Sequence, residues 1–462
     1  MTTPAPLMVT ISGMRGIAGQ SLTQEAVGRY LGAFASLLME STKTPTVVIG
    51  RDGRLGGDKI LRFAIEGLRS AGCDVVDLDV AMTPTVGLMT KQLGADGGVV
   101  ITASHNPGQW NGVKCIDSTG AALAPDAATR LVARYRDGGL SGSDQPGSLT
   151  RNTDAARIHF DAVMDAIGEI VPTDEIRAKH FGVVLDSVNA SGRIAGSLLL
   201  NALGCDITHI GDGDSGVFDH PPEPTEANLA GLCGHVLDFD ADIGFAQDPD
   251  ADRLAIIDES GAYIGEEHTL VLAARALFGG ASAPADPCVA TNLSTSRMID
   301  DYLAEIGGRV VRTPVGEANV VAGMRANHCK LSGEGNGGVI WPRVVDIRDS
   351  LGAMGLTLAL LTRSGKPLSA VIASYPGYAI VKRKVDTREG LAPAAVAAIA
   401  ERYKSERLDT SDGVRVDFDS QRAWLHVRAS NTEPILRLIA EAPDGQTASD
   451  ILDGAQAIVE AL

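Results

Sequence analysis

The stretch Thr46-Val-Val-Ile-Gly-Arg-Asp-Gly-Arg54 shows the pattern that decides the fold, a short apolar run that ends abruptly in glycine and charged residues. The apolar run predicts a buried strand, and the polar residues after it predict a loop. A helical pattern follows over residues 61–68, and a second strand-like run covers residues 73–80. Strand, loop, helix and strand in this order form the unit from which parallel sheets are built.

The same unit recurs twice further along the chain. Residues 181–186 predict a strand and 194–203 a helix, and residues 288–291 and 298–306 repeat the pair. The similarity lies in the pattern and not in residue identity. We therefore expect three related α/β domains with mixed, mainly parallel sheets.

The C-terminal part of the chain has a different pattern. Residues 414–418 and 423–427 alternate around a turn, which predicts an antiparallel hairpin, and residues 448–462 predict a final helix. These features indicate a small α+β domain. A Gly- and Ser-rich stretch at 137–148 indicates the first linker. The expected domains cover residues 1–150, 151–257, 258–368 and 369–462.

Composition limits the classes of partner. The chain has 462 residues and a net charge of -18, which argues against nucleic acid or an anionic membrane as the main partner. The six cysteines form no C-x-x-C pair, so we expect reduced thiols and neither a zinc site nor a disulfide framework. The N-terminus does not resemble a signal peptide, and no uncharged apolar run reaches the roughly 20 residues of a membrane span. A cytoplasmic location is expected.

A candidate nucleophile lies in the stretch Gly98-Val-Val-Ile-Thr-Ala-Ser-His-Asn-Pro-Gly108. The apolar run predicts a buried strand, and Ser104 and His105 follow in a tight loop. A serine at a strand end is well placed to act as a covalent carrier. Taken alone, the loop is better explained as a turn whose polar side chains satisfy backbone groups, and the other motifs of the chain decide for the carrier.

A candidate metal site lies in Gln247-Asp-Pro-Asp-Ala-Asp-Arg253. Asp248, Asp250 and Asp252 alternate, so an extended loop would turn their carboxylates to one side. Carboxylate oxygens suit Mg²⁺. A solvated acidic turn is the alternative, whereas an EF-hand loop is excluded because Arg253 stands where that loop needs glycine.

Two further loops contain groups that suit a sugar phosphate. Gly333-Glu-Gly-Asn-Gly-Gly338 matches the letters of a dinucleotide fingerprint, but a strand-like run follows it where that fingerprint needs a helix. Glu334 and Asn336 could instead bind vicinal sugar hydroxyls. In Arg428-Ala-Ser-Asn-Thr-Glu-Pro-Ile-Leu-Arg437, two guanidinium groups flank hydroxyl and amide groups, which is the equipment of a phosphate site.

Taken together, these motifs resemble those of the α-D-phosphohexomutase family, in the family's order and across essentially the whole chain. The segments that carry the resemblance are TASHNP (102–107), DPDADR (248–253), GEGNGG (333–338) and RASNTEPILR (428–437). The resemblance implies four domains, each presenting one loop to a central cleft. It also implies an enzyme that interconverts hexose 6-phosphates and hexose 1-phosphates through a phosphoserine and a hexose 1,6-bisphosphate.

The resemblance also implies roles for individual residues. Ser104 would carry the phosphoryl group, and Asp248, Asp250, Asp252 and a phosphoserine oxygen would bind Mg²⁺. Arg15 and Arg253 would stabilise the phosphoryl oxygens, Lys114 would act as general acid/base, and His105 is a further catalytic candidate. The expected substrate-binding residues are Glu334, Asn336, Gly316, Arg428, Ser430, Asn431, Thr432 and Arg437.

The sequence departs from the family pattern at two positions. Gly338 stands where many relatives have a histidine, which leaves His105 and His268 as candidates for a second acid/base. Pro314 replaces a lysine found in many phosphoglucosamine mutases.

Phosphoglucosamine mutase is the favoured specific activity, with phosphomannomutase or phosphoglucomutase as the alternative. A magnesium-dependent phosphatase with a serine nucleophile and a non-catalytic sugar-phosphate binding protein are more distant alternatives. The expected partner is a small sugar phosphate, and the chain is expected to be a monomer or homodimer.

Overall fold

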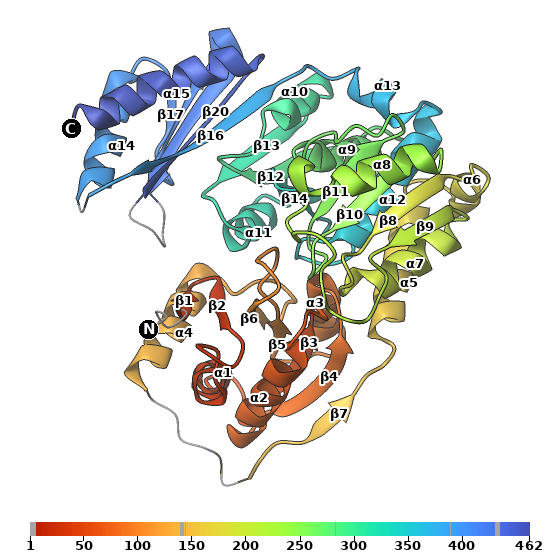
Figure 1. Cartoon of the computed structure of the whole chain (residues 1–462). Coiled ribbons are helices and arrows are strands. Elements are labelled where there is room, and N and C mark those ends of the chain that lie inside the picture. Colours follow the sequence, from red (N-terminus) through yellow and green to blue (C-terminus); the bar gives the residue numbers. More distant parts are fainter. Residues whose placement is uncertain (1–5, 139–142, 144, 282, 389, 430–434) are drawn as a thin grey trace.

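The computed structural model describes residues 6–138, 143, 145–281, 283–388, 390–429 and 435–462. These residues form four β-sheets that follow one another along the chain, each with its own helices (Figure 1). The first three sheets mix parallel and antiparallel strands, and the fourth is antiparallel throughout. The expected fold class is confirmed. The exact domain boundaries stay predictions.

The first sheet has parallel strands at its centre and antiparallel strands at one edge. Its strands lie in the spatial order β1 (Met8–Thr10), β2 (Gly13–Ile17), β6 (Trp110–Asp117), β5 (Gly97–Ile101), β3 (Thr46–Arg51), β4 (Asp74–Val80) and β7 (Leu149–Arg151). Its helices are α1 (Gln24–Leu38), α2 (Gly57–Ser70), α3 (Thr83–Gln92) and α4 (Pro125–Asp137).

The second and third sheets are smaller, and in each of them an antiparallel strand joins parallel ones. The second runs β11 (Leu254–Asp258), β10 (Ile243–Gln247), β8 (Gly182–Asp186) and β9 (Asp206–Ile210), and the third runs β13 (Arg309–Thr313), β12 (Cys288–Asn292), β14 (Leu331–Glu334) and β15 (Gly338–Ile340). Their helices are α5 (Ala155–Gly168), α6 (Thr173–Arg177), α7 (Gly192–Ala202), α8 (Ala230–Asp238), α9 (His268–Phe278), α10 (Met298–Glu305), α11 (Glu317–Ala326), α12 (Ser350–Ser364) and α13 (Leu368–Ile372).

The C-terminal domain is a separate α+β layer, with two helices on an antiparallel sheet (Figure 1). Its strands run β16 (Ala379–Asp386), β20 (Ile435–Ala442), β19 (Ala423–Ala429), β18 (Val414–Phe418) and β17 (Arg407–Asp409), and its helices are α14 (Leu391–Arg402) and α15 (Gly445–Glu460). The predicted hairpin and the predicted final helix are both present as β18–β19 and α15.

Strand periodicity divides the apolar side chains of the first sheet between two cores. Val47 and Ile49 on β3 join a core made with α1 and α2, whereas Val48 points to the other face and joins a second core. This second core continues without a break through the next two domains, by way of α3, α5, α9 and α12. The C-terminal domain has a core of its own.

One expectation from the cysteines is wrong. Cys288 and Cys329 form a disulfide, whereas Cys73, Cys115, Cys205 and Cys233 are thiols. The two bridged residues are 41 positions apart in sequence, but Cys288 begins β12 and Cys329 lies just before the neighbouring parallel strand β14, and their Cα atoms are 4.6 Å apart. Sequence spacing gave no signal for this pairing because it depends on the strand order.

No helix in the described ranges has the length and apolar character needed to cross a membrane.

The close packing of α12 on α5 is testable at Gly355. A Cβ atom at this position would lie 2.1 Å from Cδ1 of Ile167 and 2.9 Å from its Cγ1. We expect Gly355→Ala to destabilise the protein by about 1–3 kcal/mol, because overpacking forces neighbouring groups to move. The measurement is denaturation followed by circular dichroism.

Gly234 on α8 is the matched control, because a Cβ atom there would meet nothing within 4 Å. Alanine at this helical position should be neutral or stabilising by up to about 1 kcal/mol. Equal stability of the two alanine variants would contradict the packing described for α12.

Candidate active site

Ser104 lies in the loop that joins β5 to β6. Its side chain is buried, with 2% exposure, and its backbone has a φ of 51°, a left-handed conformation uncommon for a residue with a side chain. The Ser104 N–H donates to Thr102 Oγ1 at 2.7 Å, and Ser104 Oγ donates to Asp248 Oδ2 at 3.1 Å. The loop therefore presents the serine hydroxyl to the acidic loop of the second domain.

Arg54 holds the loop in this conformation. Its guanidinium donates to the carbonyl oxygens of Ser104, Asn106 and Trp110, the last at 2.9 Å. Arg54 is itself fixed by Asp52, which accepts from Arg54 Nε at 2.7 Å, and both side chains are buried. One cation thus binds carbonyl groups of the Ser104 loop and of the first residue of β6.

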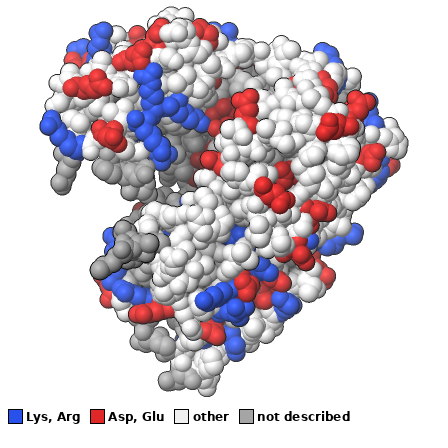
Figure 2. All heavy atoms as spheres, in the orientation of Figure 1, with Lys and Arg blue, Asp and Glu red and all other residues white. Residues whose placement is uncertain are grey.

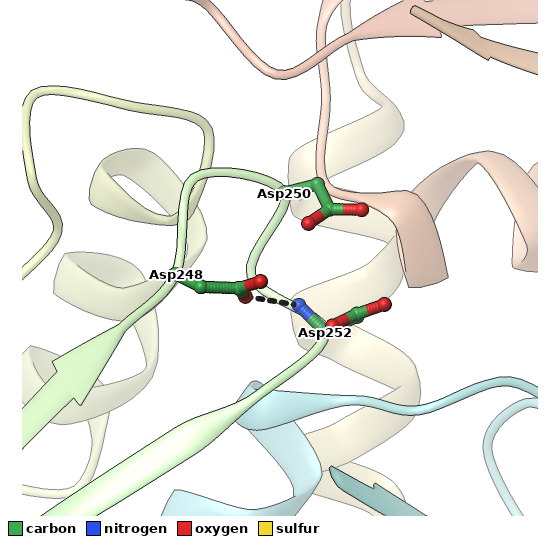
Figure 3. A group of neighbouring side chains, drawn as sticks. All are labelled: Asp248, Asp250 and Asp252. Carbon is green, nitrogen blue, oxygen red and sulfur yellow. Dashed lines mark hydrogen bonds between the residues drawn. The ribbon is translucent and has the colours of Figure 1, made fainter. Parts of the chain in front are cut away.

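The three aspartates lie on a tight turn between β10 and β11, and not on the extended loop that the sequence predicts (Figure 3). Ala251 has a φ of 53° and its N–H donates to Asp248 O at 2.8 Å. Asp248 Oδ1 accepts from the backbone N–H groups of Asp252 and Arg253, both at 3.1 Å. The turn still gathers the carboxylates, with one oxygen of each within 4.8 Å of the others.

Cations from other domains compensate this buried negative charge. Two carboxylates about 4.8 Å apart repel one another by roughly 3 kcal/mol at an effective dielectric constant of about 20. Lys114 Nζ lies 2.6 Å from Asp250 Oδ2 and 3.5 Å from Asp252 Oδ2, and Arg348 Nη2 lies 2.6 Å from Asp252 Oδ2. The repulsion among the aspartates and their ion pairs with Lys114 and Arg348 therefore favour the contact of the first and third domains with the acidic turn.

The pKa values follow from this arrangement. Burial and then the charges of Asp252 and Asp250 raise the pKa of Asp248 well above its usual value. Burial would also raise the pKa of Asp250, but the ion pair with Lys114 outweighs it and lowers that pKa. Burial would lower the pKa of Lys114, but the carboxylates of Asp250 and Asp252 raise it.

The triad fits a divalent cation. Asp250 Oδ1 and Asp252 Oδ1 are buried and have no hydrogen-bond partner among the residues that the structure describes. A buried carboxylate oxygen without a partner is costly, and a cation ligated by such oxygens removes the cost. Within the described ranges, this is the only cluster of His, Cys, Asp or Glu with metal-ligand spacing.

The first domain supplies further contacts around the serine. Thr83, in the first turn of α3, donates from Oγ1 to Asp250 Oδ2 at 2.7 Å. Arg15 on β2 donates to Asn106 Oδ1 at 2.9 Å. Arg253 is mostly buried on the acidic turn, and burial, together with the charge of Arg253, lowers the pKa of Arg15.

The structure separates the two histidine candidates. His105 Nδ1 lies 3.3 Å from Ser104 Oγ, whereas His268 stacks on Tyr375 at the start of α9. Burial, followed by the charges of Arg253 and Arg15, lowers the pKa of His105 to about 3. The neighbouring arginines thus disfavour the protonated ring, and its Nδ1 is next to the serine hydroxyl.

The glycine-rich loop is the turn of the β14–β15 hairpin. Glu334 is buried, and it accepts from Asn292 Nδ2 at 2.8 Å and from Arg348 Nη1 at 3.0 Å. Asn336 is partly exposed, and its Oδ1 accepts from the N–H of Gly338 at 3.2 Å. Arg348 therefore links Glu334 to Asp252 on the acidic turn.

The C-terminal domain brings basic side chains together. Arg428 on β19 is in register with Arg437 on β20, which is in register with Lys384 on β16, so the three side chains share one face of the sheet. Figure 2 shows Lys and Arg gathered on this domain beside the hollow that separates it from the N-terminal domain. Ser430, Asn431 and Thr432 lie outside the described residues.

Asp412 connects this cationic face to the third domain. It forms an ion pair with Arg428 at 3.0 Å and accepts from the N–H of Val315 at 3.0 Å. Gly316 follows with a φ of 124° and caps α11. The two loops expected to bind substrate in the third and fourth domains are therefore joined by one carboxylate.

Sequence reasoning missed Arg54, Thr83 and Arg348. Arg54 stands in a polar loop directly after a buried strand. The same placement made Ser104 a candidate, so it could also have identified Arg54. Thr83 gave no signal in its own sequence context. Arg348 lies in an irregular segment between β15 and α12, and its role depends on contacts with two other loops.

A buried serine next to a carboxylate triad, with lysine and arginine groups around it, has the charge distribution that suits phosphoryl transfer. Comparison with known proteins specifies the class further. Models of the phosphoglucomutase/phosphomannomutase α/β/α domains I, II and III match residues 8–140, 161–261 and 265–378, and the model of the C-terminal domain matches residues 380–456. The chain belongs to this family and is a phosphohexomutase.

Relatives with different names match over nearly the full length. The chain is 36% identical to the phosphoglucomutase/phosphomannomutase of Thermococcus kodakarensis, covering 97% of this chain and 98% of that protein. It is 35% identical to the "Probable phosphoglucosamine mutase" of Methanopyrus kandleri (96% and 95%) and 31% identical to the phosphoglucosamine/phosphogalactosamine mutase of Sulfurisphaera tokodaii (97% and 98%). A phosphoglucomutase/phosphomannomutase family protein of Burkholderia thailandensis has a similar structure, with a TM-score of 0.82, 26% identity and 98% of each chain covered.

The contacts of Arg54 predict a specific kinetic defect. A lysine at this position keeps the charge but cannot reach the same set of carbonyl groups. We expect Arg54→Lys to lower kcat about 100-fold with little change in KM, because a misplacement of about 1 Å in the serine has an effect of that size. Mutase turnover and thermal melting are measured together.

Arg62→Lys is the control, since Arg62 forms an exposed ion pair with Asp58 on α2. It should leave both kinetic constants unchanged. A wild-type kcat for Arg54→Lys, or a loss fully explained by unfolding, would show that Arg54 does not position Ser104.

Proposed function

We propose that the enzyme interconverts hexose 6-phosphates and hexose 1-phosphates through a phosphorylated Ser104 and a hexose 1,6-bisphosphate, with glucosamine phosphates as the favoured substrates. The observation that carries the proposal is the contact of Ser104 Oγ with Asp248 Oδ2 at 3.1 Å, made between two domains and with Lys114 on the neighbouring acidic residues. A serine in this environment is suited to store and release a phosphoryl group.

Each half of the reaction is one phosphoryl transfer. The bond between phosphorus and Ser104 Oγ breaks as a bond forms between phosphorus and a hydroxyl oxygen of the bound sugar phosphate, which gives the bisphosphate. The sugar hydroxyl loses one proton, and Ser104 Oγ gains one. After the bisphosphate reorients, its other phosphate returns to Ser104 by the reverse exchange, so the enzyme is restored and the sugar phosphate is isomerised.

Lys114 is assigned the proton exchange between the sugar hydroxyl and the serine oxygen. Its position supports the role, because Lys114 Nζ is held 2.6 Å from Asp250 on the triad that faces Ser104. His105 is assigned as the second acid/base, since its Nδ1 lies 3.3 Å from Ser104 Oγ. Arg15 and Arg253 are assigned to the phosphoryl oxygens.

Asp248, Asp250, Asp252 and an oxygen of phosphorylated Ser104 would hold Mg²⁺, which when bound neutralises charge on the transferring group and on the serine oxygen. The oxygens of Asp250 and Asp252 that have no hydrogen-bond partner in the described part of the chain support this assignment. The chain's own contribution is to hold these oxygens within 4.8 Å of one another.

The remaining assigned residues bind the parts of the substrate that do not react. The phosphate that is not transferring would be held by Arg428, Ser430, Asn431, Thr432 and Arg437. Glu334 would accept hydrogen bonds from sugar hydroxyls, and Asn336 would exchange hydrogen bonds with them. Gly316 would lie next to the sugar. Lys384 is added to the phosphate site because it is in register with Arg437.

The sugar is the finer part of the proposal. The names of the Methanopyrus and Sulfurisphaera relatives support glucosamine phosphates, and the name of the Thermococcus relative supports the alternative of glucose or mannose phosphates. Substrates that differ at one hydroxyl or amino group are distinguished by one or two contacts in the site. A phosphatase that uses Ser104 as nucleophile is the more distant alternative.

Ser104→Ala tests the covalent carrier. Without Oγ no phosphoserine forms, so we expect loss of mutase turnover to background and no phosphate on the tryptic peptide that contains residue 104, as measured by mass spectrometry. The exposed Ser118 is the matched control, and Ser118→Ala should keep wild-type turnover. Full turnover by Ser104→Ala would contradict the proposal.

A substrate panel tests the sugar and the metal. Turnover of the 6-phosphates of glucosamine, glucose and mannose is compared with Mg²⁺ and with excess EDTA. We expect kcat/KM to be highest for glucosamine 6-phosphate, and EDTA to abolish turnover because three carboxylates are left without a cation. Undiminished turnover in EDTA excludes the metal role, and a higher kcat/KM for glucose or mannose phosphate selects the alternative.

A further inference from the structure

Arg348 lies at the point where two of the site's loops meet. It follows β15 in the segment that leads to α12, and its side chain is mostly buried. Arg348 Nη1 donates to Glu334 Oε2 at 3.0 Å, and Nη2 donates to Asp252 Oδ2 at 2.6 Å. Glu317 Oε2 lies 3.6 Å from the same guanidinium. One cation therefore bridges carboxylates of the glycine-rich loop and of the acidic turn.

The hairpin residue Gly338 leaves the space that Arg348 occupies. A Cβ atom at position 338 would lie 2.2 Å from Cδ of Arg348 and 3.0 Å from its Cγ. Any residue with a Cβ atom at 338 therefore requires the aliphatic part of the Arg348 side chain to move. In this chain, the space that a side chain at 338 would fill is therefore occupied by Arg348.

The two contacts of Arg348 also determine which carboxylate oxygens remain available. Asp252 Oδ2 is taken by Arg348 and Lys114, which leaves Oδ1 for a cation. Glu334 Oε1 is held by Asn292 and Oε2 by Arg348, so both oxygens are fixed in direction with one lone pair each left for a sugar hydroxyl. A planar guanidinium presents separate N–H groups to two carboxylates in a fixed geometry, whereas an ammonium group is a single charge centre without that directional fork.

We propose that Arg348 is a positioning residue that couples the sugar-binding loop to the metal-binding turn, and that Gly338 is required in order to admit it. Binding of the cation at Asp252 and binding of the sugar at Glu334 then favour each other, because each orders the guanidinium that the other needs. The inference rests on the proposed function for the identity of the two ligands.

The test measures binding, and so does not depend on turnover. Mn²⁺ is used as the probe for the triad, with free Mn²⁺ counted by electron paramagnetic resonance in the absence and presence of glucosamine 6-phosphate. In the wild type, the sugar phosphate should tighten Mn²⁺ binding. Arg348→Met should weaken Mn²⁺ binding about tenfold or more, as loss of a group that orients a metal ligand does, and should abolish the effect of the sugar phosphate.

Arg348→Lys separates charge from geometry. It keeps a cation near both carboxylates but lacks the directional fork, so Mn²⁺ binding should recover in part while the effect of the sugar phosphate stays lost. Arg343→Met is the matched control, because Arg343 lies on the same segment and pairs with the exposed Glu169. It should bind both probes like the wild type, and thermal melting of every variant separates these effects from unfolding.

Gly338→Ala completes the test as one half of a double-mutant cycle with Arg348→Ala. In the wild-type background the alanine should weaken Mn²⁺ binding about as much as Arg348→Ala does, and in the Arg348→Ala background it should add almost nothing. Independent, additive effects of the two changes would overturn the steric part of the proposal.

The outcomes also separate this inference from the proposed function. Wild-type Mn²⁺ binding by a folded Arg348→Met variant overturns the inference even if the enzyme is a glucosamine phosphate mutase. If the wild type binds none of the hexose phosphates, the proposed function fails, and the dependence of Mn²⁺ binding on Arg348 and Gly338 still decides the role of the arginine.

Discussion

The electrostatic compensation of a buried carboxylate triad is the constraint on which the arrangement of the domains depends. Three aspartates on one turn repel one another, and the turn contains only Arg253 as a cation of its own. Lys114 and Thr83 come from the first domain and Arg348 from the segment after the third sheet. A carboxylate cluster that needs partners from other domains can be stable only when those domains are assembled.

The packing follows the same division. The first three domains share one continuous apolar core, in which α12 is buried among α5, α7 and α9, so the elements that present Ser104, the triad and Glu334 are fixed to one another. The C-terminal domain has its own core and meets the third domain through polar contacts such as Ser294 with His426, Arg422 with Asp301 and Val315 with Asp412. The loops that carry Ser104, the aspartate triad and Glu334 thus rest on apolar packing, whereas the C-terminal domain contacts the third domain through hydrogen bonds and ion pairs.

The sequence allowed the fold class and most of the loops of the candidate site to be predicted, because both depend on local patterns. Apolar runs that end in polar loops identified β3, β8 and β12, and the alternation of apolar residues identified the β18–β19 hairpin. What could not be predicted depends on contacts between distant segments. The disulfide of Cys288 with Cys329 requires the strand order of the third sheet, and the role of Arg348 requires two other loops.

The shape of the acidic loop shows a second limit of local patterns. Alternation of Asp248, Asp250 and Asp252 predicts an extended strand with the carboxylates on one side, but the chain turns at Ala251 and caps itself through Asp248 Oδ1. The prediction of a shared carboxylate cluster was correct for a different geometric reason. The turn, stabilised by Asp248, brings the carboxylate oxygens within 4.8 Å of one another. Along an extended strand, residues on the same face lie about 7 Å apart.

The most direct test of the account follows the phosphoryl group itself. Enzyme carrying ³²P on Ser104 is mixed with unlabelled hexose 6-phosphate and Mg²⁺, and the reaction is stopped after milliseconds. The account predicts that the label moves into a hexose bisphosphate at least as fast as the enzyme turns over. Release of the label as inorganic phosphate at that rate, with none in the sugar, would contradict it and identify a phosphatase.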